Sequence, residues 1–264
     1  MATMGYSLFP QETSRRLLQA QGHPGDGKVI AGLLHRQGGR FPLPSRTLIS
    51  FASFLIVASA AASGDAASGV KTIAAAVDAH YNHLRSLQAE FTEVYRGSGM
   101  ERTEAGTLWL KKPGKMRWEY RSPREKLFVS DGKDAWFYVP GDRQARKTAA
   151  KKLEDVRSPL AFLLGKTKLE KELRGLSLAS DVTAVQPGNV VLRGVPQGLE
   201  DRVSEILLEV TADRRIARIV IQEVDGSATE YRFTDQKEDV PVGDARFEFR
   251  PPAGTETVEG GLGP

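Results

Sequence analysis

The sequence contains no cysteine among its 264 residues. This absence excludes disulfide bonds, thiolate metal sites, a cysteine nucleophile and a lipid-modified N-terminal cysteine. Histidine is scarce too, with four in the chain. Two of the four precede residue 62. The other two, His80 and His83, lie three apart on a predicted helix with no carboxylate or cysteine at ligand spacing on the same face. We therefore expect no metal, no cofactor and few groups for acid–base catalysis near neutral pH.

Motifs of catalytic chemistry are missing as well. The sequence has no Gly-x-Ser-x-Gly elbow and no His-Glu-x-x-His helix. Residues 165–167 read Gly-Lys-Thr, but a phosphate-binding loop needs a glycine five residues earlier, where Leu160 stands. Asp131 and Asp134 flank an Asp-Gly dipeptide, which is typical of a hairpin turn rather than of a catalytic carboxylate pair. The sequence thus predicts no catalytic residues and disfavours an enzyme.

The sequence also lacks a hydrophobic run long enough to span a membrane, and this absence bears on the N-terminal residues. Residues 1–45 are rich in Gly, Pro, Arg and Gln, so we expect a disordered extension or a start codon assigned too far upstream. Residues 46–62 give a basic residue, an apolar run and an alanine-rich end, the order of a secretory signal peptide. The run is shorter than the roughly 20 apolar residues of a spanning helix. We expect export and cleavage, which leaves residues 63–264 as one domain.

The excess of positive charge lies in that front segment. The formal net charge of the chain is +4, and the first 62 residues hold six basic residues against Glu12 and Asp26, so the remainder is neutral. Basic residues do interleave with tryptophans in residues 109–152, a composition that can bind single-stranded nucleic acid by stacking. An exported and neutral domain offers no bulk attraction for nucleic acid, so we expect none as a partner. Docking of an acidic protein partner on these basic residues stays open.

Beyond the front, the pattern predicts one helix and then mostly strands. Residues 69–87 carry apolar side chains at three- and four-residue steps, the period of an amphipathic helix. From residue 88 the period becomes two, and turn signals then recur every 8–12 residues over much of the chain. Regular short strands of this kind predict an antiparallel sheet or barrel.

The central stretch, residues 106–140, holds all three tryptophans between hairpin turns. In it Met116, Trp118 and Tyr120 alternate with charged residues, so this strand has one apolar face. Residues 158–165 then predict a short helix, with a serine as N-cap, a proline in the first turn and a glycine as stop. A helix so short and so apolar must be covered, or must itself cover an apolar surface.

In their order these motifs resemble the LolA family of periplasmic outer-membrane lipoprotein carriers. The resemblance extends over about residues 69–258 and is most specific in the centre. The similar segments are residues 108–113 (LWLKKP), 117–123 (RWEYRSP), 129–140 (VSDGKDAWFYVP), 158–164 (SPLAFLL) and 247–254 (FEFRPPAG).

The resemblance implies a mainly β fold: an unclosed antiparallel β-barrel, or half-barrel, with an N-terminal helix and short helices forming a lid over an apolar cavity. It implies acylated lipoproteins as cargo, an inner-membrane lipoprotein-releasing ABC transporter as the donor and an outer-membrane lipoprotein receptor as the acceptor. A periplasmic location follows from the same resemblance, and we expect a monomer.

The candidate residues for the lipid-binding cavity are the large apolar side chains of these segments. They are Leu108, Leu110, Trp118, Tyr120, Phe128, Trp136, Tyr138, Leu160, Phe162, Leu163 and Leu164. Alternation along a strand indicates which residues share a face, but it does not indicate which face is concave. A filled barrel would use the same residues as its core.

The family has an arginine before the proline of a Lys-Arg-Pro segment, and this arginine tethers the lid by hydrogen bonds to the lid backbone. Lys112 stands at the matching position, before Pro113. Lysine keeps the charge but lacks the planar fork of donors. Either the lid is held more loosely here, or Arg117 on the next strand shares the task. We expect Lys112 and Arg117 as the lid latch.

A second function stays open: a protein of the same fold that senses lipid or mislocalised lipoprotein and regulates an envelope stress pathway. Such a regulator is expected to have an additional domain, and no change of composition after residue 234 indicates one. The outer-membrane receptor of this fold needs a lipidated cysteine, which the sequence lacks.

Overall fold

The computed structural model of the protein describes residues 62–151, 163 and 168–260. The predicted N-terminal extension lies outside this part of the chain, as does the predicted signal peptide apart from its last residue. Of the predicted lid helix at 158–165, the structure describes Leu163.

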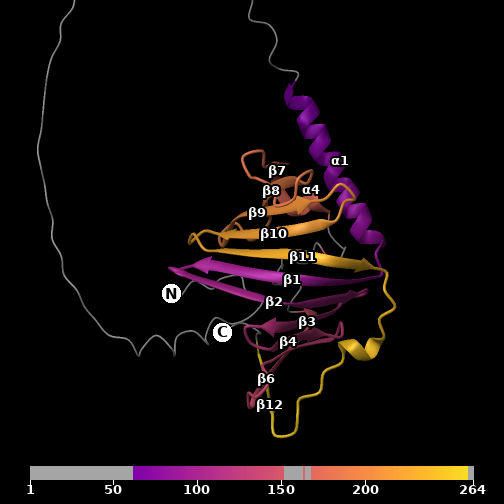
Figure 1. The fold of residues 1–264 in the computed structure, drawn as a ribbon, viewed down its shortest axis with the longest axis vertical. Coiled ribbons are helices and arrows are strands. Elements are labelled where there is room, and N and C mark those ends of the chain that lie inside the picture. The colour runs from indigo at the N-terminus through magenta and orange to yellow at the C-terminus, as the bar shows by residue number, and fades with distance from the viewer. Residues whose placement is uncertain (1–61, 152–162, 164–167, 261–264) are drawn as a thin grey trace, which may run out of the picture.

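One twelve-stranded sheet dominates the described residues (Figure 1). The elements in chain order are α1 (Ala62–His83), β1 (Ser86–Gly97), β2 (Met100–Lys111), β3 (Lys115–Ser122), β4 (Lys126–Ser130), β5 (Asp134–Tyr138), β6 (Gln144–Ala149), α4 (Leu169–Glu172), β7 (Leu173–Leu178), β8 (Val190–Pro196), β9 (Val203–Val210), β10 (Ile216–Glu223), β11 (Ala228–Glu238), the 3-10 helix η3 (Asp244–Phe247) and β12 (Glu256–Glu259). The strand order is β12-β6-β5-β4-β3-β2-β1-β11-β10-β9-β8-β7.

The sheet is open, with β12 and β7 at its two edges. Neighbouring strands are antiparallel except for β12, which runs parallel to β6. Strand β11, although late in the chain, pairs with β1. The two halves of the sheet therefore meet in the middle at the β1–β11 pair. The predicted mainly β, antiparallel and unclosed architecture is confirmed.

The N-terminal helix α1 lies along the β7 side of the sheet (Figure 1). Its buried residues Val70, Ala74, Val77 and Tyr81 recur at three- and four-residue steps, so one stripe of the helix meets the core. The hydroxyl of Tyr81 accepts the backbone N–H of Ile216 at 2.8 Å. Burial raises the pKa of Tyr81 well above its usual value, so this hydroxyl stays neutral.

A second polar contact joins α1 to α4. Both carboxylate oxygens of Asp78 accept the backbone N–H of Leu169, at 3.1 and 3.0 Å. Asp78 therefore satisfies one of the free N–H groups at the start of α4. Burial raises the pKa of Asp78, and the hydrogen bond from Leu169 opposes that shift.

The curvature of the sheet is evident from the contacts of one aromatic side chain, Trp118. Trp118 of β3 lies with its ring centroid 6.0 Å from Tyr231 and 6.4 Å from Phe233, both on β11. Because β2 and β1 lie between β3 and β11, the backbones are three strand spacings apart, about 14 Å in a flat sheet. Side chains stand roughly perpendicular to a sheet, so these rings can meet only if the sheet curls toward them. The face that carries Trp118 is therefore the concave face.

On the opposite, convex face, the C-terminal segment, residues 239–259, packs against β2, β4 and β5. We call this segment, which is yellow in Figure 1, the strap. Phe247 of η3 is buried against Trp109 and Val129, with Trp136 beside them. At the rim, the carboxylate of Asp244 binds the ammonium groups of two lysines, Lys111 at 2.6 Å and Lys115 at 2.9 Å. The strap thus combines an aromatic cover with a charged attachment.

Gly106 lets the concave face close over Phe91, which lies opposite it between β1 and β2. A β-carbon at Gly106 would lie 1.9 Å from the carbonyl oxygen of Glu119 and 2.9 Å from Cε1 of Phe91. We expect Gly106→Ala to lower the free energy of unfolding by about 1–3 kcal/mol through overpacking, measured by chemical denaturation. Gly69→Ala is the matched control: apart from its own helix, no atom of the described residues lies within 4 Å of its β-carbon, so this helix substitution should raise stability by up to about 1 kcal/mol. Equal stability of Gly106→Ala and the parent would contradict the steric argument.

The strap attachment predicts an acid-sensitive contact. Hydrogen bonds from Lys111 and Lys115 lower the pKa of Asp244 from 3.8 to about 2. A lowered carboxyl pKa means that the contact is fully present above pH 3.8 and is lost as the pH falls toward 2. A carboxyl NMR titration should give Asp244 a pKa of about 2. The double substitution Lys111→Ala, Lys115→Ala should return it toward 3.8, and a parent value near 3.8 would show that the strap is not held by these lysines.

Candidate functional site

Six of the predicted cavity residues lie together on the concave face. All six are buried in one cluster with apolar residues of β9, β10 and β11. They are Leu108, Leu110, Trp118, Tyr120, Phe128 and Leu163. Contact of these side chains with cargo stays a prediction. Leu160, Phe162 and Leu164 lie outside the described residues.

The register explains why these residues share a face. Leu108 is opposite Trp118, and Trp118 is opposite Phe128, across three adjacent strands. Directly opposed residues lie on the same side of a sheet. Phe91 completes the group, since its ring lies 4.7 Å from Trp118 and 4.8 Å from Tyr120 in edge-to-face contacts, which are favourable aromatic geometries.

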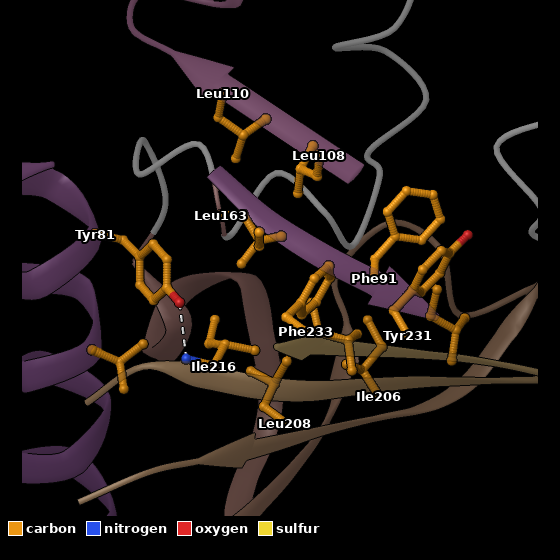
Figure 2. Close-up of a cluster of buried hydrophobic side chains, with 14 of the residues drawn as sticks. Tyr81, Phe91, Leu108, Leu110, Leu163, Ile206, Leu208, Ile216, Tyr231 and Phe233 are labelled. Atoms are coloured by element: carbon orange, nitrogen blue, oxygen red, sulfur yellow. Dashed lines mark hydrogen bonds between the residues drawn. The ribbon is translucent and has the colours of Figure 1, made fainter. Parts of the chain in front are cut away.

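Leu163 lies at one end of this face. Figure 2 shows it between Leu108 and Leu110 of β2 on one side and Ile216 of β10 on the other, with Tyr81 of α1 nearby. Next to it is a small, partly open pocket of about 10 Å³, room for about one water molecule. Its lining includes Leu84, Leu87, Leu110, Lys112 and Leu163. We call this end of the concave face the mouth.

The structure corrects the prediction for Trp136 and Tyr138. Between β4 and β5 the register pairs Phe128 with Phe137 and Val129 with Trp136. Phe137 therefore joins the concave face, whereas Trp136 and Tyr138 lie on the convex face. Both contact Phe249 of the strap, with ring centroids 5.5 Å apart in each case. Because side chains alternate along a strand, an offset of one residue in β5 moves the whole set to the other face.

Lys112 connects the mouth to the end of α1. Its ammonium group donates to the backbone carbonyl of Tyr81 at 2.5 Å and to that of Asn82 at 3.0 Å. These carbonyls belong to the last turn of α1, where carbonyls lack partners within the helix and carry partial negative charge. Burial lowers the pKa of Lys112, and the charge of Asp239 opposes that shift. Lys112 thus acts as a cationic cap on the helix.

Arg117 does not share this contact. It lies opposite Trp109 on the convex face, where it pairs with Glu119 and donates to the carbonyl of Arg246 in the strap at 3.0 Å. This placement does not support a share for Arg117 in the latch, which stays a prediction. Lys112 and Arg117 are close in the sequence, but their side chains point to opposite faces of the sheet.

Much of the concave face escaped prediction, because it comes from strands with generic sequences. These residues are Phe91, Ile206, Leu208, Ile219, Ile221, Tyr231 and Phe233. Their alternation in β9–β11 is readable in the sequence. Only the long-range pairing of β1 with β11 assigns them to the same face as Trp118.

A buried polar cluster ends the concave face at the side away from the mouth. We call it the polar cluster; its members are Glu93, Arg102, Glu104, Tyr120 and Lys126. Glu93 and Glu104 lie opposite each other between β1 and β2 and are 1% and 5% exposed. Tyr120 donates to Glu93 at 2.6 Å. Lys126 pairs with Glu104 at 2.6 Å, and Arg102 lies 3.4 Å from the same carboxylate.

Burial sets the electrostatics of the polar cluster. It raises the pKa of Glu93, against the hydrogen bond from Tyr120. It also raises the pKa of the Tyr120 phenol, with the charge of Glu93 acting in the same direction. Burial lowers the pKa of Lys126, while the hydrogen bond to Glu104 opposes the shift. Glu93 lies opposite Glu104 of β2 and Tyr231 of β11, so it faces the concave side.

Two negative findings apply to residues 62–151, 163 and 168–260. Within them, no three His, Cys, Asp or Glu side chains gather closely enough to hold a metal ion. None of the helices there combines the length and the apolar character needed to cross a membrane.

Fold and site together define a class: an open, curved β-sheet with a helix at its mouth and an apolar concave face. Comparison with known proteins gives the family. The family model "Outer membrane lipoprotein carrier protein LolA" matches residues 82–250, which is more than half of the sequence. The chain belongs to the LolA family.

Two relatives by sequence agree with this assignment. An outer-membrane lipoprotein carrier protein of Chromobacterium violaceum is 28% identical over 78% of this chain and 97% of its own length. One of Alkalilimnicola ehrlichii is 31% identical over 70% of this chain and 82% of its own length. A solved LolA superfamily protein of Nitrosomonas europaea aligns over 68% of this chain and 97% of that chain, with 12% identity and a TM-score of 0.39.

The helix cap at the mouth can be tested directly. Lys112→Leu removes the cation from the carbonyls of Tyr81 and Asn82, so we expect the free energy of unfolding to fall by about 1–2 kcal/mol. Amide hydrogen exchange should rise in the last turn of α1. Lys112→Arg, which keeps a charged donor, is the control and should stay near the parent. Unchanged exchange in Lys112→Leu would mean that the other contacts of α1 hold its last turn.

Proposed function

We propose that this protein is a periplasmic carrier that binds the acyl chains of lipoproteins on its concave face. It receives them from an inner-membrane ABC transporter and delivers them to a receptor on the outer membrane. It works as a monomer and without enzymatic chemistry. The observation that carries the proposal is the apolar concave face of an open sheet, made by both halves of a chain that belongs to the LolA family.

The energetics of the cargo demand such a face. Each methylene transferred out of water contributes about 0.8 kcal/mol, so a chain of roughly 16 carbons costs on the order of 12 kcal/mol to leave exposed. Crossing an aqueous compartment therefore requires apolar cover along most of the chain. Phe91, Trp118, Phe128 and the aliphatic residues of β9 and β10 offer a continuous surface of this kind.

Loading requires this surface to open. Its side chains now pack against one another, and the pocket at the mouth is far smaller than an acyl chain. We infer that Leu163, which packs on this face, is displaced by cargo. Lys112 holds α1 beside the mouth, which supports its role as the latch.

Export completes the proposal. Residues 46–62 serve as the signal peptide, and residues 63–264 form the single mature carrier domain. The alanine-rich end of the predicted signal peptide and the neutral charge of the remainder support this division.

Depletion of the protein in its own host tests the function. Lipoproteins destined for the outer membrane should accumulate at the inner membrane, as followed by membrane fractionation. A sensor of envelope stress would change the expression of stress genes and leave lipoproteins in place, and that result would overturn the carrier role. Mass spectrometry of the purified protein should also detect co-purifying acyl species.

The assignment of the two faces gives a sharper prediction. A photoreactive acyl probe bound to the protein should label Trp118 and Phe128, because the concave face holds the chain. It should leave Trp136 and Tyr138 unlabelled, since these lie on the neighbouring strand β5 but face the strap. Peptide mapping by mass spectrometry reads out both sets in one sample, so the convex residues are an internal control. Equal labelling of the two sets would contradict binding on the concave face.

A further inference from the structure

The apolar strip of the concave face has two different ends. At the mouth, Leu87 of β1 lies opposite Leu110 of β2. Six residues further along β1, Glu93 lies opposite Glu104. At about 3.3 Å per residue, the two pairs are about 20 Å apart along the strand. The apolar strip is thus bounded at one end by a pocket and at the other by the polar cluster.

The members of the polar cluster form hydrogen bonds and ion pairs with one another. Lys126 and Glu104 form an ion pair with side chains 13% and 6% exposed, and the ammonium of Lys126 also lies 4.4 Å from the ring centroid of Tyr120. Tyr120 in turn donates to Glu93. Buried charges are costly to separate from their partners. A methylene group that reaches this cluster gains no apolar contact and cannot displace the pairs.

Thr229 extends the polar boundary across β11. It lies opposite Tyr95 of β1 and alternates with Tyr231 and Phe233, so it faces the concave side. Thr229 is 0% exposed, and its hydroxyl has no hydrogen-bond partner in the described part of the chain. The boundary therefore crosses five adjacent strands, β4, β3, β2, β1 and β11.

The direction of acyl entry follows from the mouth. The partly open pocket lies beside Lys112 and Leu163, whereas Glu93, Glu104 and Tyr120 of the polar cluster are buried. The protein part of a lipoprotein cannot enter the fold, so it must stay outside at the open end. An acyl chain that enters at the mouth advances with its terminal methyl group toward Phe91 and then toward Tyr120.

We propose that the polar cluster is the blind end of the acyl-binding face and sets the length of acyl chain that the protein binds. This inference rests on the proposed carrier function. The chemistry it selects is an acyl chain that ends before Glu93. Longer chains leave their additional methylenes outside the apolar strip, where they add no affinity.

Affinity as a function of chain length tests the proposal. The probes are cysteinyl peptides that each carry one N-acyl chain of increasing length, and titration with the mature protein gives Kd. For the parent, Kd should fall about fourfold for each added methylene that reaches apolar surface, and then level off at a defined length. In the double variant Glu93→Leu, Tyr120→Phe, the fall should continue to longer chains. This variant removes both partners of one hydrogen bond, so neither is left unpaired.

Glu93→Gln is the matched control. It keeps a polar side chain that can accept from Tyr120, so the levelling-off length should match that of the parent. A parent that binds the peptides with no levelling-off, or a double variant that levels off at the parent length, overturns the blind end while the carrier function stands. A parent that binds no acyl peptide of any length overturns the carrier function itself.

A second measurement uses the parent alone and does not depend on a variant that folds. A peptide whose acyl chain carries a diazirine at its terminal carbon should label Phe91 or Tyr120. Labelling of Leu84 or Leu110 by the terminal carbon would place the methyl end at the mouth and would overturn the direction of entry.

Discussion

The contact of Trp118 with Tyr231 and Phe233 is the constraint on which the molecule depends. It draws β3 toward β11 over two intervening strands, and so it turns a flat twelve-stranded sheet into a curved one. Curvature in turn gives the two faces different roles. Without it, the residues of β1–β4 and those of β9–β11 would form two separate patches, and neither patch would be wide enough to surround an acyl chain. Gly106 is part of the same arrangement, because it gives Phe91 the space to fill the bend.

A single sheet with large side chains on both faces needs a second cover, and the strap provides it. Trp109, Trp136 and Val129 on the convex face would form an exposed apolar patch of the kind that promotes association. The strap buries them under Phe247 and is held at the rim by Asp244, while Arg246 lies with its guanidinium 4.5 Å from the ring centroid of Trp109. The concave face can therefore be devoted to cargo, because the stability of the convex face does not depend on it.

The sequence predicted the structure correctly where a local motif was present. It did not predict which residues share a face where this depends on the pairing of strands far apart in the chain. Alternation in β3 correctly grouped Trp118 with Tyr120, and the family motifs led to an open sheet. The same alternation was misapplied in β5, because the length of the turn after β4 decides whether Trp136 or Phe137 faces inward. Alternation in β3 also puts Arg117 on the face opposite Trp118, away from the mouth. No local pattern could show that β1 pairs with β11, so the face of Glu93 and the contribution of Tyr231 became clear only in three dimensions.

Lysine at position 112 bears on how easily the carrier opens. Its ammonium group satisfies two carbonyls at the end of α1, and net hydrogen bonds of this charged kind contribute about 1.5–3 kcal/mol each when well shielded, less at a partly exposed site. The contact at Lys112 is thus worth about 1–2 kcal/mol, which is little to overcome when the carrier opens. Since Arg117 faces the strap, the concave side gains no second cation from it. The acyl chain supplies on the order of 12 kcal/mol when bound, so binding can drive opening. Release must then be driven by an acceptor that offers the chain an equally apolar environment.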